Sequence, residues 1–213
     1  MRVFHRPRSR SHRVVWMLEE LGADYELTLF TRADALTDEH RERHPLGRVP
    51  VLEVDGRFSF ESAALCLHLA DCYPEAGLIA PPGSYERACA YQWALFAMTE
   101  IEPGLVGHKR GEDDERKAAA AKLFRAGASV LEQVLDGHKF LIGDHFSVAD
   151  VVAGSVAGDG GPSGLLEGLP NVSEWDRRLR ARPARLRTDA IAEPRAAGGR
   201  AGLRHQRSTC PRP

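Results

Sequence analysis

The residue types best suited to chemistry gather between residues 44 and 63, where a predicted pair of strands runs into a helix. Glu61 and Ser62 stand directly before an apolar helical pattern, so Ser62 is predicted to cap that helix. A helix start presents unpaired N–H groups and the positive end of the helix dipole, and a small carboxylate or phosphate would bind there. Upstream, a cis Val49–Pro50 bond would turn the chain sharply and offer the N–H and C=O of Val49 to a ligand.

A second group of candidate residues follows the first predicted strand. The loop from Arg6 to Arg13 contains two serines, Ser9 and Ser11, among several arginines. Ser11 is also well placed to cap the next helix, which would occupy its oxygen as an acceptor. A hydroxyl near a helix start can donate to an anion, and backbone N–H groups or a loop arginine could do the same work.

The elements that position these residues follow from hydrophobic periodicity. The predicted strands are Met1–His5, Tyr25–Phe30, Val51–Val54 and Arg57–Phe60, and the predicted helices are Arg13–Leu21, a short irregular one within 33–43, and Ala63–Tyr73. A parallel strand pair joined by a helix and followed by an antiparallel hairpin is the thioredoxin-like α/β arrangement. Asp55-Gly56, between the last two strands, predicts a type I′ turn.

Beyond residue 74 the pattern predicts a linker over residues 75–84 and then an all-α domain over residues 85–183. Ser147 and Asp150 predict a capping box at the start of a buried helix in this domain. A long helix is expected over Asp113–Leu135. Its predicted inward residues are Leu123, Ala126, Val130, Leu131, Val134 and Leu135.

Residues 184–213 differ in character from the rest of the chain. They are rich in Arg, Ala, Gly and Pro and show no sustained periodicity. We therefore expect an atypical tail without regular structure, or the product of an altered reading frame. An ordered helix after Pro183 would count against both interpretations.

Composition limits the function classes. With 213 residues, 43% hydrophobic and 28% charged, the chain reads as a soluble globular protein of one large or two small domains. A net charge of −1 gives no reason to expect nucleic acid or a membrane surface as a partner. The four cysteines show no CxxC and no paired spacing, which argues against a metal site or a dithiol oxidoreductase and favours a reduced, cytoplasmic setting.

The order and spacing of these motifs resemble the cytosolic glutathione transferase family. The matching run is His44-Pro45-Leu46-Gly47-Arg48-Val49-Pro50-Val51-Leu52, followed by Glu61-Ser62. The resemblance covers residues 1 to about 183 and implies two domains. Residues 1–74 would be a thioredoxin-like glutathione-binding domain, and residues 85–183 an all-α helical domain that forms the wall for an electrophile.

The resemblance also implies roles for single residues. Val49, before Pro50, would pair in antiparallel fashion with the cysteinyl backbone of glutathione, while Glu61 and Ser62 would hold its γ-glutamyl group. The remaining candidates are assigned by position in the motifs: His44 and Arg48 to the glycyl carboxylate, Ser9 to the catalytic hydroxyl of bacterial, serine-type members, and Ser11 as its alternate.

Two residues depart from the family pattern. His44 replaces the usual Asn, and Arg8 stands where many relatives have Gly, so a bulky cation could reshape the mouth of the pocket.

The function implied is a glutathione transferase that stabilises the glutathione thiolate for attack on a small hydrophobic electrophile, or its isomerase or dehalogenase variants. Such a detoxification enzyme would be a cytoplasmic homodimer with glutathione as co-substrate and no metal. The alternative is a non-catalytic, transferase-like interaction or regulatory module, which Arg8, His44 and the unusual C-terminus would favour.

Overall fold

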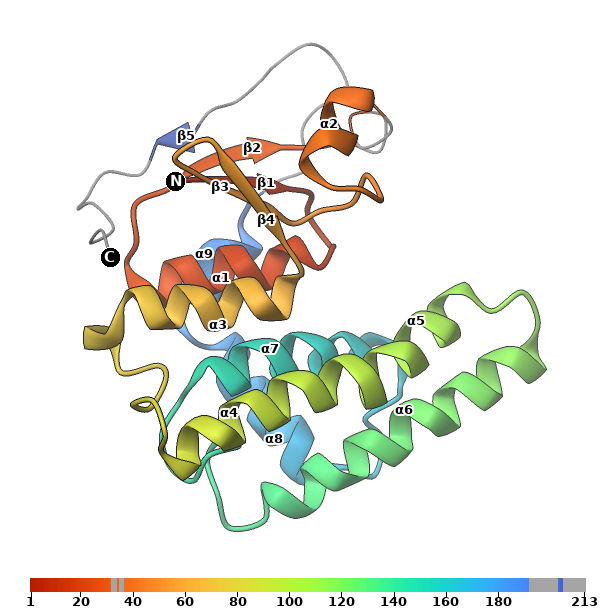
Figure 1. Ribbon diagram of the computed structural model, residues 1–213. Coiled ribbons are helices and arrows are strands. Elements are labelled where there is room, and N and C mark those ends of the chain that lie inside the picture. Colours follow the sequence, from red (N-terminus) through yellow and green to blue (C-terminus); the bar gives the residue numbers. More distant parts are fainter. Residues whose placement is uncertain (32–33, 35–36, 192–202, 205–213) are drawn as a thin grey trace. The chain divides into compact units, whose positions relative to one another are not determined.

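The computed structural model describes residues 1–31, 34, 37–191 and 203–204. The chain divides into two compact units. The N-terminal unit contains Met1–Ala76 and the chain from Pro183 onward, and the helical unit contains Gly77–Arg182 (Figure 1). The first boundary between the units, Ala76 to Gly77, lies within the linker predicted over residues 75–84.

A mixed sheet with strand order β4-β3-β1-β2-β5 forms the centre of the N-terminal unit. Its strands are β1 (Arg2–His5), β2 (Glu26–Leu29), β3 (Val51–Val54), β4 (Arg57–Phe60) and the two-residue β5 (Leu203–Arg204). Strand β1 runs parallel to β2 and β3 runs antiparallel to β4, as expected, and β1 pairs antiparallel with β3. Asp55 and Gly56 have φ angles of 50° and 73°, so the predicted type I′ turn is confirmed.

Helices cover both faces of this sheet. They are α1 (Ser11–Leu21), α2 (Asp38–Arg43), α3 (Ser62–Cys72) and α9 (Pro183–Asp189), with a short 3₁₀ turn at Pro74–Ala76. Successive residues of a strand face opposite sides, and β1 shows this clearly. Phe4 contacts the ring of His40 on α2, whereas His5 reaches the start of α1. Helix α1 packs between α3 and α9, which completes a thioredoxin-like fold (Figure 1).

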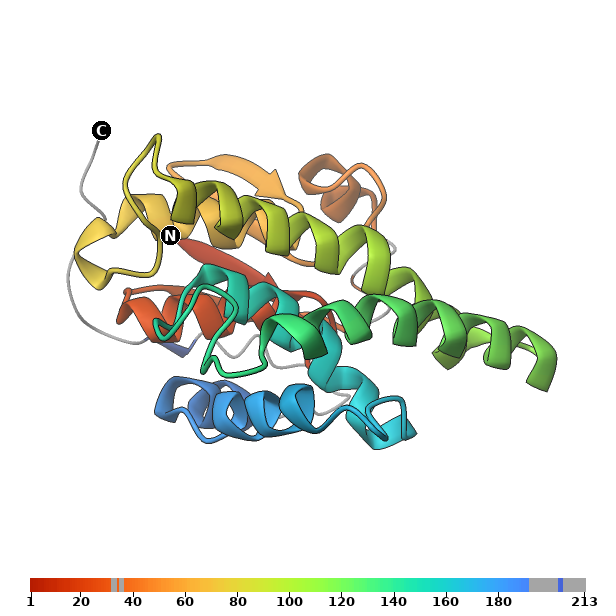
Figure 2. The same cartoon turned by 90° about the horizontal axis from the view of Figure 1, so that it is seen from below.

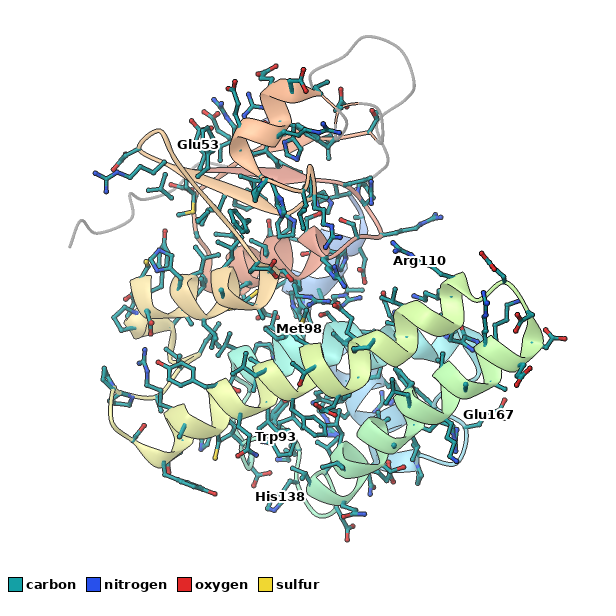
Figure 3. The ribbon with its side chains drawn as sticks, turned by 45° about the vertical axis from the view of Figure 1, so that its right-hand side comes forward. Glu53, Trp93, Met98, Arg110, His138 and Glu167 are labelled. Atoms are coloured by element: carbon teal, nitrogen blue, oxygen red, sulfur yellow. The ribbon has the colours of Figure 1, made fainter. Side chains whose placement is uncertain are left out.

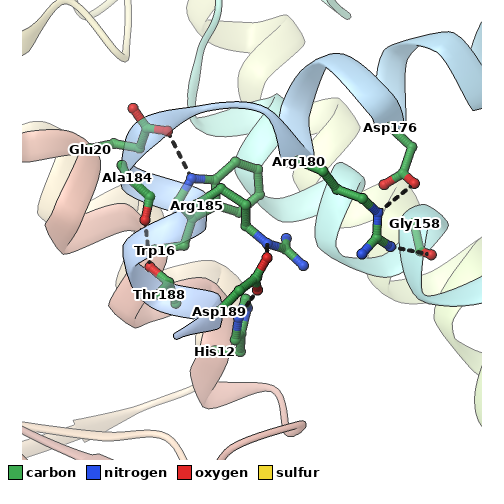
Figure 4. Close-up of polar contacts among 10 residues, drawn as sticks. All are labelled: His12, Trp16, Glu20, Gly158, Asp176, Arg180, Ala184, Arg185, Thr188 and Asp189. Carbon is green, nitrogen blue, oxygen red and sulfur yellow. Dashed lines mark hydrogen bonds and ion pairs between the residues drawn. The ribbon is translucent and has the colours of Figure 1, made fainter. Parts of the chain in front are cut away.

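Helix α9 occupies part of the chain where we expected a tail without regular structure. Ala184 and Thr188 are buried, and the Arg185 guanidinium lies 4.9 Å from the centre of the Trp16 ring of α1 (Figure 4). Asp189 accepts a hydrogen bond from His12 at 2.7 Å. The expectation therefore fails for residues 184–189, because an arginine stem supplies packing that composition does not reveal. Residues 192–202 and 205–213 lie outside the described residues.

The helical unit consists of α4 (Tyr85–Phe96), α5 (Glu102–Arg110), α6 (Asp114–Val134), α7 (Val148–Ala157) and α8 (Pro170–Arg180), with a π turn at Ala97–Ile101 and a 3₁₀ helix at Gly158–Ser163. Helices α5 and α6 lie side by side (Figure 2). A Cβ on Gly104 would stand 2.4 Å from the backbone nitrogen of Phe124, so only glycine permits this approach. Trp93 of α4, labelled in Figure 3, packs edge-to-face on Phe96.

The predicted inward face of α6 is partly wrong. Leu131 and Leu135 are buried, but Leu123 is 46% exposed and Val130 38% exposed. The buried residues of the helix itself are Phe124, Gly127, Ala128 and Leu131. The packed face carries small residues such as Gly127 where leucine was expected, because the backbone of Glu100 comes so close.

The start of α7 confirms the predicted capping box. Asp150 accepts hydrogen bonds from the N–H and the hydroxyl of Ser147 at 2.9 and 3.2 Å, from Leu141 N–H at 3.0 Å and from Trp175 Nε1 at 2.9 Å. The carboxyl is fully buried. Its hydrogen bonds join the segment at Leu141, the start of α7 and Trp175 of α8. Among the described residues, no helix combines the length and apolar character needed to cross a bilayer.

Candidate functional site

Strand register brings three sequence segments to one edge of the sheet in the N-terminal unit. Phe4 pairs with Val51, and Val51 pairs with Phe60 on its other side. His5 at the end of β1, Pro50 just before β3 and Glu61 just after β4 each follow these paired residues at the same end of the sheet. The first loop, the Val49–Pro50 step and the Glu61-Ser62 pair are therefore neighbours, and the Val49–Pro50 bond is cis.

Ser62 lies at the start of α3 but does not cap it as predicted. It is the first residue of the helix, and no side chain among the described residues caps this end. Its buried hydroxyl instead accepts a hydrogen bond from Arg13 Nη1 at 3.2 Å. Because the oxygen accepts from arginine, its own proton remains available for donation to an anion.

Arg13 makes a specific contact that the sequence analysis did not predict. It was considered only as one of several loop cations, yet it is 5% exposed and joins the first turn of α1 to the first residue of α3. A buried guanidinium beside a helix start adds a full positive charge to the helix dipole. The spacing of Arg13 after Ser9 and Ser11 gave no signal of this contact.

Glu61 combines an exposed side chain with a strained backbone. Its φ of 73° lies in the left-handed region, which costs a non-glycine residue about 1–3 kcal/mol. Its carbonyl accepts the N–H of Leu65 at 2.9 Å, so the backbone is held in this conformation by the helix. An exposed carboxylate next to a positive helix start suits a ligand with an ammonium group and a carboxylate, such as an α-amino acid head.

Ser9 and Ser11 differ sharply in their surroundings. Ser11 is fully buried, and its hydroxyl contacts His5 Nδ1 at 2.8 Å and accepts from Arg6 N–H at 3.0 Å. It is the first residue of α1 and not its cap. Ser9 is half-buried, donates to the carbonyl of Arg6 at 2.7 Å and lies 2.7 Å from Ser11 Oγ. Only Ser9 has an exposed part that a ligand can reach.

His44 and Arg48 flank the segment that leads to Pro50. His44 is 4% exposed, its Nδ1 accepts the N–H of Leu46 at 3.1 Å, and burial, as the largest cause, lowers the pKa of its imidazole. Its remaining nitrogen, Nε2, is the one that could meet a ligand. Arg48 has an exposed side chain, while its carbonyl accepts a hydrogen bond from His40 Nε2 at 2.9 Å.

His40 was missed by sequence reasoning, because a histidine in a polar helix carries no signal of burial. It is completely buried, and its ring centre lies 4.5 Å from that of Phe30. Through its bond to Arg48 it fixes the chain just before Val49. Arg8, the departure in the first loop, has a φ of 56°, which explains why glycine suits this place.

The described residues contain no cluster of three or more His, Cys, Asp or Glu side chains arranged to hold a metal ion. The residues that the structure brings together are an exposed carboxylate, a buried arginine, two helix starts and a half-buried hydroxyl. This set can bind a zwitterionic head group and stabilise an anion by hydrogen bonding.

Comparison with known proteins identifies the family. Residues 8–72 match the glutathione S-transferase N-terminal domain, and residues 87–183 match the glutathione S-transferase C-terminal domain. The chain is 30% identical to the glutathione S-transferase hmp2 of Hypomyces subiculosus, over 84% of this chain and 92% of that one. It is 34% identical to the maleylacetoacetate isomerase of Dictyostelium discoideum over 54% of this chain and 56% of that protein.

A solved structure shows the same architecture. The glutathione S-transferase of a sphingomonad, complexed with glutathione, superposes with a TM-score of 0.79 at 28% identity, covering 89% of this chain and 97% of that one. Since the two domain matches cover most of the chain and a relative of similar length is 30% identical, this protein belongs to the glutathione S-transferase family, as its motifs predicted.

Proposed function

We propose that this glutathione transferase binds glutathione as co-substrate at the edge of its sheet, lowers the pKa of the thiol and directs the thiolate to a small hydrophobic electrophile. The observation that carries the proposal is the strand register, Phe4 with Val51 and Val51 with Phe60, which brings the first loop, the Val49–Pro50 step and Glu61 to one edge of the sheet. This register supports the proposal because a helix start suited to a carboxylate, a main chain suited to an extended peptide and the loop that contains Ser9 all adjoin that edge.

The γ-glutamyl end of glutathione suits the start of α3. Its ammonium group would pair with the exposed carboxylate of Glu61. Its carboxylate would accept from the Ser62 hydroxyl and from the N–H groups of the first turn, with the Arg13 charge behind them. Each charged hydrogen bond of this kind contributes about 1.5–3 kcal/mol.

The cysteinyl part would lie along Val49. A peptide running antiparallel to this residue can exchange main-chain hydrogen bonds with its N–H and C=O, as an added strand does. Beyond it, the exposed Arg48 and Nε2 of His44 would hold the glycyl carboxylate. In this arrangement the thiol points to the start of α1, where Ser9 stands.

Thiolate formation is the chemical work of the protein. A free thiol has a pKa of about 8.5, and lowering it by two units requires about 2.7 kcal/mol of preferential stabilisation of the anion. A hydrogen bond from Ser9 together with the dipole of α1 is sufficient in magnitude. The thiolate then attacks the electrophile, and its positioning supplies the remaining rate enhancement.

We extend to this chain the cytoplasmic homodimer that the family resemblance implies. The relatives described above are named as transferases and an isomerase, so nothing in them favours the non-catalytic module.

Retention on immobilised glutathione and turnover of a chlorinated arene test the proposal. We expect the wild type to be retained and to turn over the arene. Glu61→Gln should bind glutathione at least tenfold more weakly. Glu53→Gln on β3 removes a carboxylate of the same sheet that pairs with Arg2 instead, and it should bind like the wild type (Figure 3). No retention of the wild type would contradict the proposal.

A further inference from the structure

Three side chains form a continuous hydrogen-bonded chain from strand β1 to Ser9. His5 Nδ1 lies 2.8 Å from Ser11 Oγ, and Ser11 Oγ lies 2.7 Å from Ser9 Oγ. His5 and Ser11 are completely buried, whereas Ser9 is half-buried. The chain therefore leads from the interior of the unit to the hydroxyl at the site.

The direction of these hydrogen bonds decides whether Ser9 has a proton to offer. A serine hydroxyl has one hydrogen and two acceptor positions. If Ser11 gives its hydrogen to His5, the short contact between the serines requires the Ser9 hydrogen to point inward. If His5 donates from Nδ1, the Ser11 hydrogen can go to Ser9 Oγ at 2.7 Å or to the Arg6 carbonyl at 3.2 Å, and the shorter contact favours Ser9. The Ser9 hydrogen can then turn toward a ligand.

Burial favours donation by His5. Its Nε2 is buried and has no hydrogen-bond partner among the described residues. A neutral imidazole carries one N–H, and an unpaired buried N–H is rarer in proteins than an unpaired acceptor. The proton is therefore better placed on Nδ1, where Ser11 accepts it. Burial, and then the nearby His12, lower the pKa of His5 to about 3, so the ring stays neutral near neutral pH.

The acceptor positions are all used in this assignment. Ser11 Oγ accepts from His5 Nδ1 and from Arg6 N–H at 3.0 Å, which fills both of its positions. Ser9 Oγ accepts from the Ser11 hydroxyl and from Ser11 N–H at 3.3 Å. The Ser9 hydrogen bonds the carbonyl of Arg6 at 2.7 Å and can leave it for a ligand.

We propose that His5 is a positioning residue that orients this chain, so that Ser9 presents its proton to the sulfur of glutathione. The inference rests on the proposed function, in which Ser9 is the hydroxyl donor. No proton leaves His5, because the ring only donates a hydrogen bond and the thiol proton passes to solvent. Hydrogen bonds aligned in one direction polarise one another, which makes Ser9 a stronger donor.

The test measures the thiol pKa of bound glutathione from the ultraviolet absorbance of the thiolate. His5→Asn places an amide N–H near the position of Nδ1, whereas His5→Gln extends its amide toward Nε2 and leaves carbon facing Ser11. We expect the wild-type thiol pKa in His5→Asn and a rise of about one unit in His5→Gln and in Ser11→Ala. The double variant His5→Gln/Ser11→Ala should be no worse than either single one, because both break one chain.

S-methylglutathione, which has no thiol proton, should bind all of these variants with the wild-type Kd. An unchanged thiol pKa in His5→Gln, or additive rises in the double variant, would overturn the inference. If thermal melting shows that His5→Gln does not fold, Ser11→Ala is compared with Ser11→Thr, which keeps the hydroxyl. Equal thiol pKa values in those two variants would also overturn it.

Ser9→Ala separates this inference from the proposed function. If Ser9→Ala leaves the thiol pKa at the wild-type value, the role of Ser9 itself fails. If Ser9→Ala raises the thiol pKa while His5→Gln and Ser11→Ala do not, only the role of His5 fails.

Discussion

Two helix starts in this protein use a serine and an acidic residue for different purposes. At the start of α7, Ser147 and Asp150 bond one another and the Asp150 carboxylate accepts four hydrogen bonds from the chain. At the start of α3, Glu61 is exposed and Ser62 accepts only from Arg13 in the contacts described above. We call the start of α7 the closed helix start, because its polar side chains bond within the chain and stabilise the fold. We call the start of α3 the open helix start, because it keeps hydrogen-bond donors for a ligand.

The largest expected effect is at the closed helix start. Asp150→Ala leaves donors from Ser147, Leu141 and Trp175 without an acceptor in a buried place, so the free energy of unfolding should fall by about 3 kcal/mol or more. Urea unfolding measures this loss. The folded fraction should keep its glutathione Kd, and a loss of affinity without a loss of stability would reverse the roles assigned to the two helix starts.

The same carboxyl gives the closed start a pH dependence. Burial, opposed by four hydrogen bonds, raises the pKa of Asp150 to about 6. Because an unfolded aspartate has a pKa near 3.9, the native state holds the proton more tightly, and the free energy of unfolding should fall by about 2–3 kcal/mol as the pH rises from about 4 to about 6. Asp150→Asn should lack this component, so equal pH profiles for the two proteins would refute the assignment.

At the open helix start the effect should appear in binding. Ser62→Ala removes a hydroxyl that would donate to the ligand carboxylate, so the glutathione Kd should rise about tenfold. Isothermal titration calorimetry measures the Kd, and urea unfolding should show a stability change below about 1 kcal/mol. A variant that loses stability but binds normally would show that this start is closed as well.

The smallest effect concerns strain. Glu61→Gly relieves the left-handed φ, but glycine loses more backbone entropy on folding, so the free energy of unfolding should increase by only about 0.5–1 kcal/mol while glutathione affinity falls. Arg8→Gly relieves a similar φ in the first loop and serves as the matched control, with the same gain in stability and little change in affinity. Unaltered stability in both variants would mean that neither backbone is strained.

Much of the N-terminal unit could be predicted from sequence because its signals are local. Asp55-Gly56 specifies its own turn, alternation marks the strands, and Gly22 ends α1 with a φ of 61°. That Ser9, Val49 and Glu61 would share one site was implied by the family resemblance and not by a local signal. The capping box of α7 was equally local.

What could not be predicted depends on contacts between distant residues. Ser11 and Ser62 look like caps, but His5 and Arg13 claim their oxygens. The packed face of α6 uses Gly127, which no hydrophobic pattern selects. Helix α9 packs through Arg185, whose buried stem is invisible to composition.

The most direct test of the open helix start compares glutathione with cysteinylglycine, which lacks the γ-glutamyl group, by isothermal titration of the wild type and of Glu61→Gln. The account predicts that cysteinylglycine binds the wild type about a hundredfold more weakly than glutathione, and that this ratio shrinks in Glu61→Gln. Equal affinity of the wild type for the two peptides would contradict it.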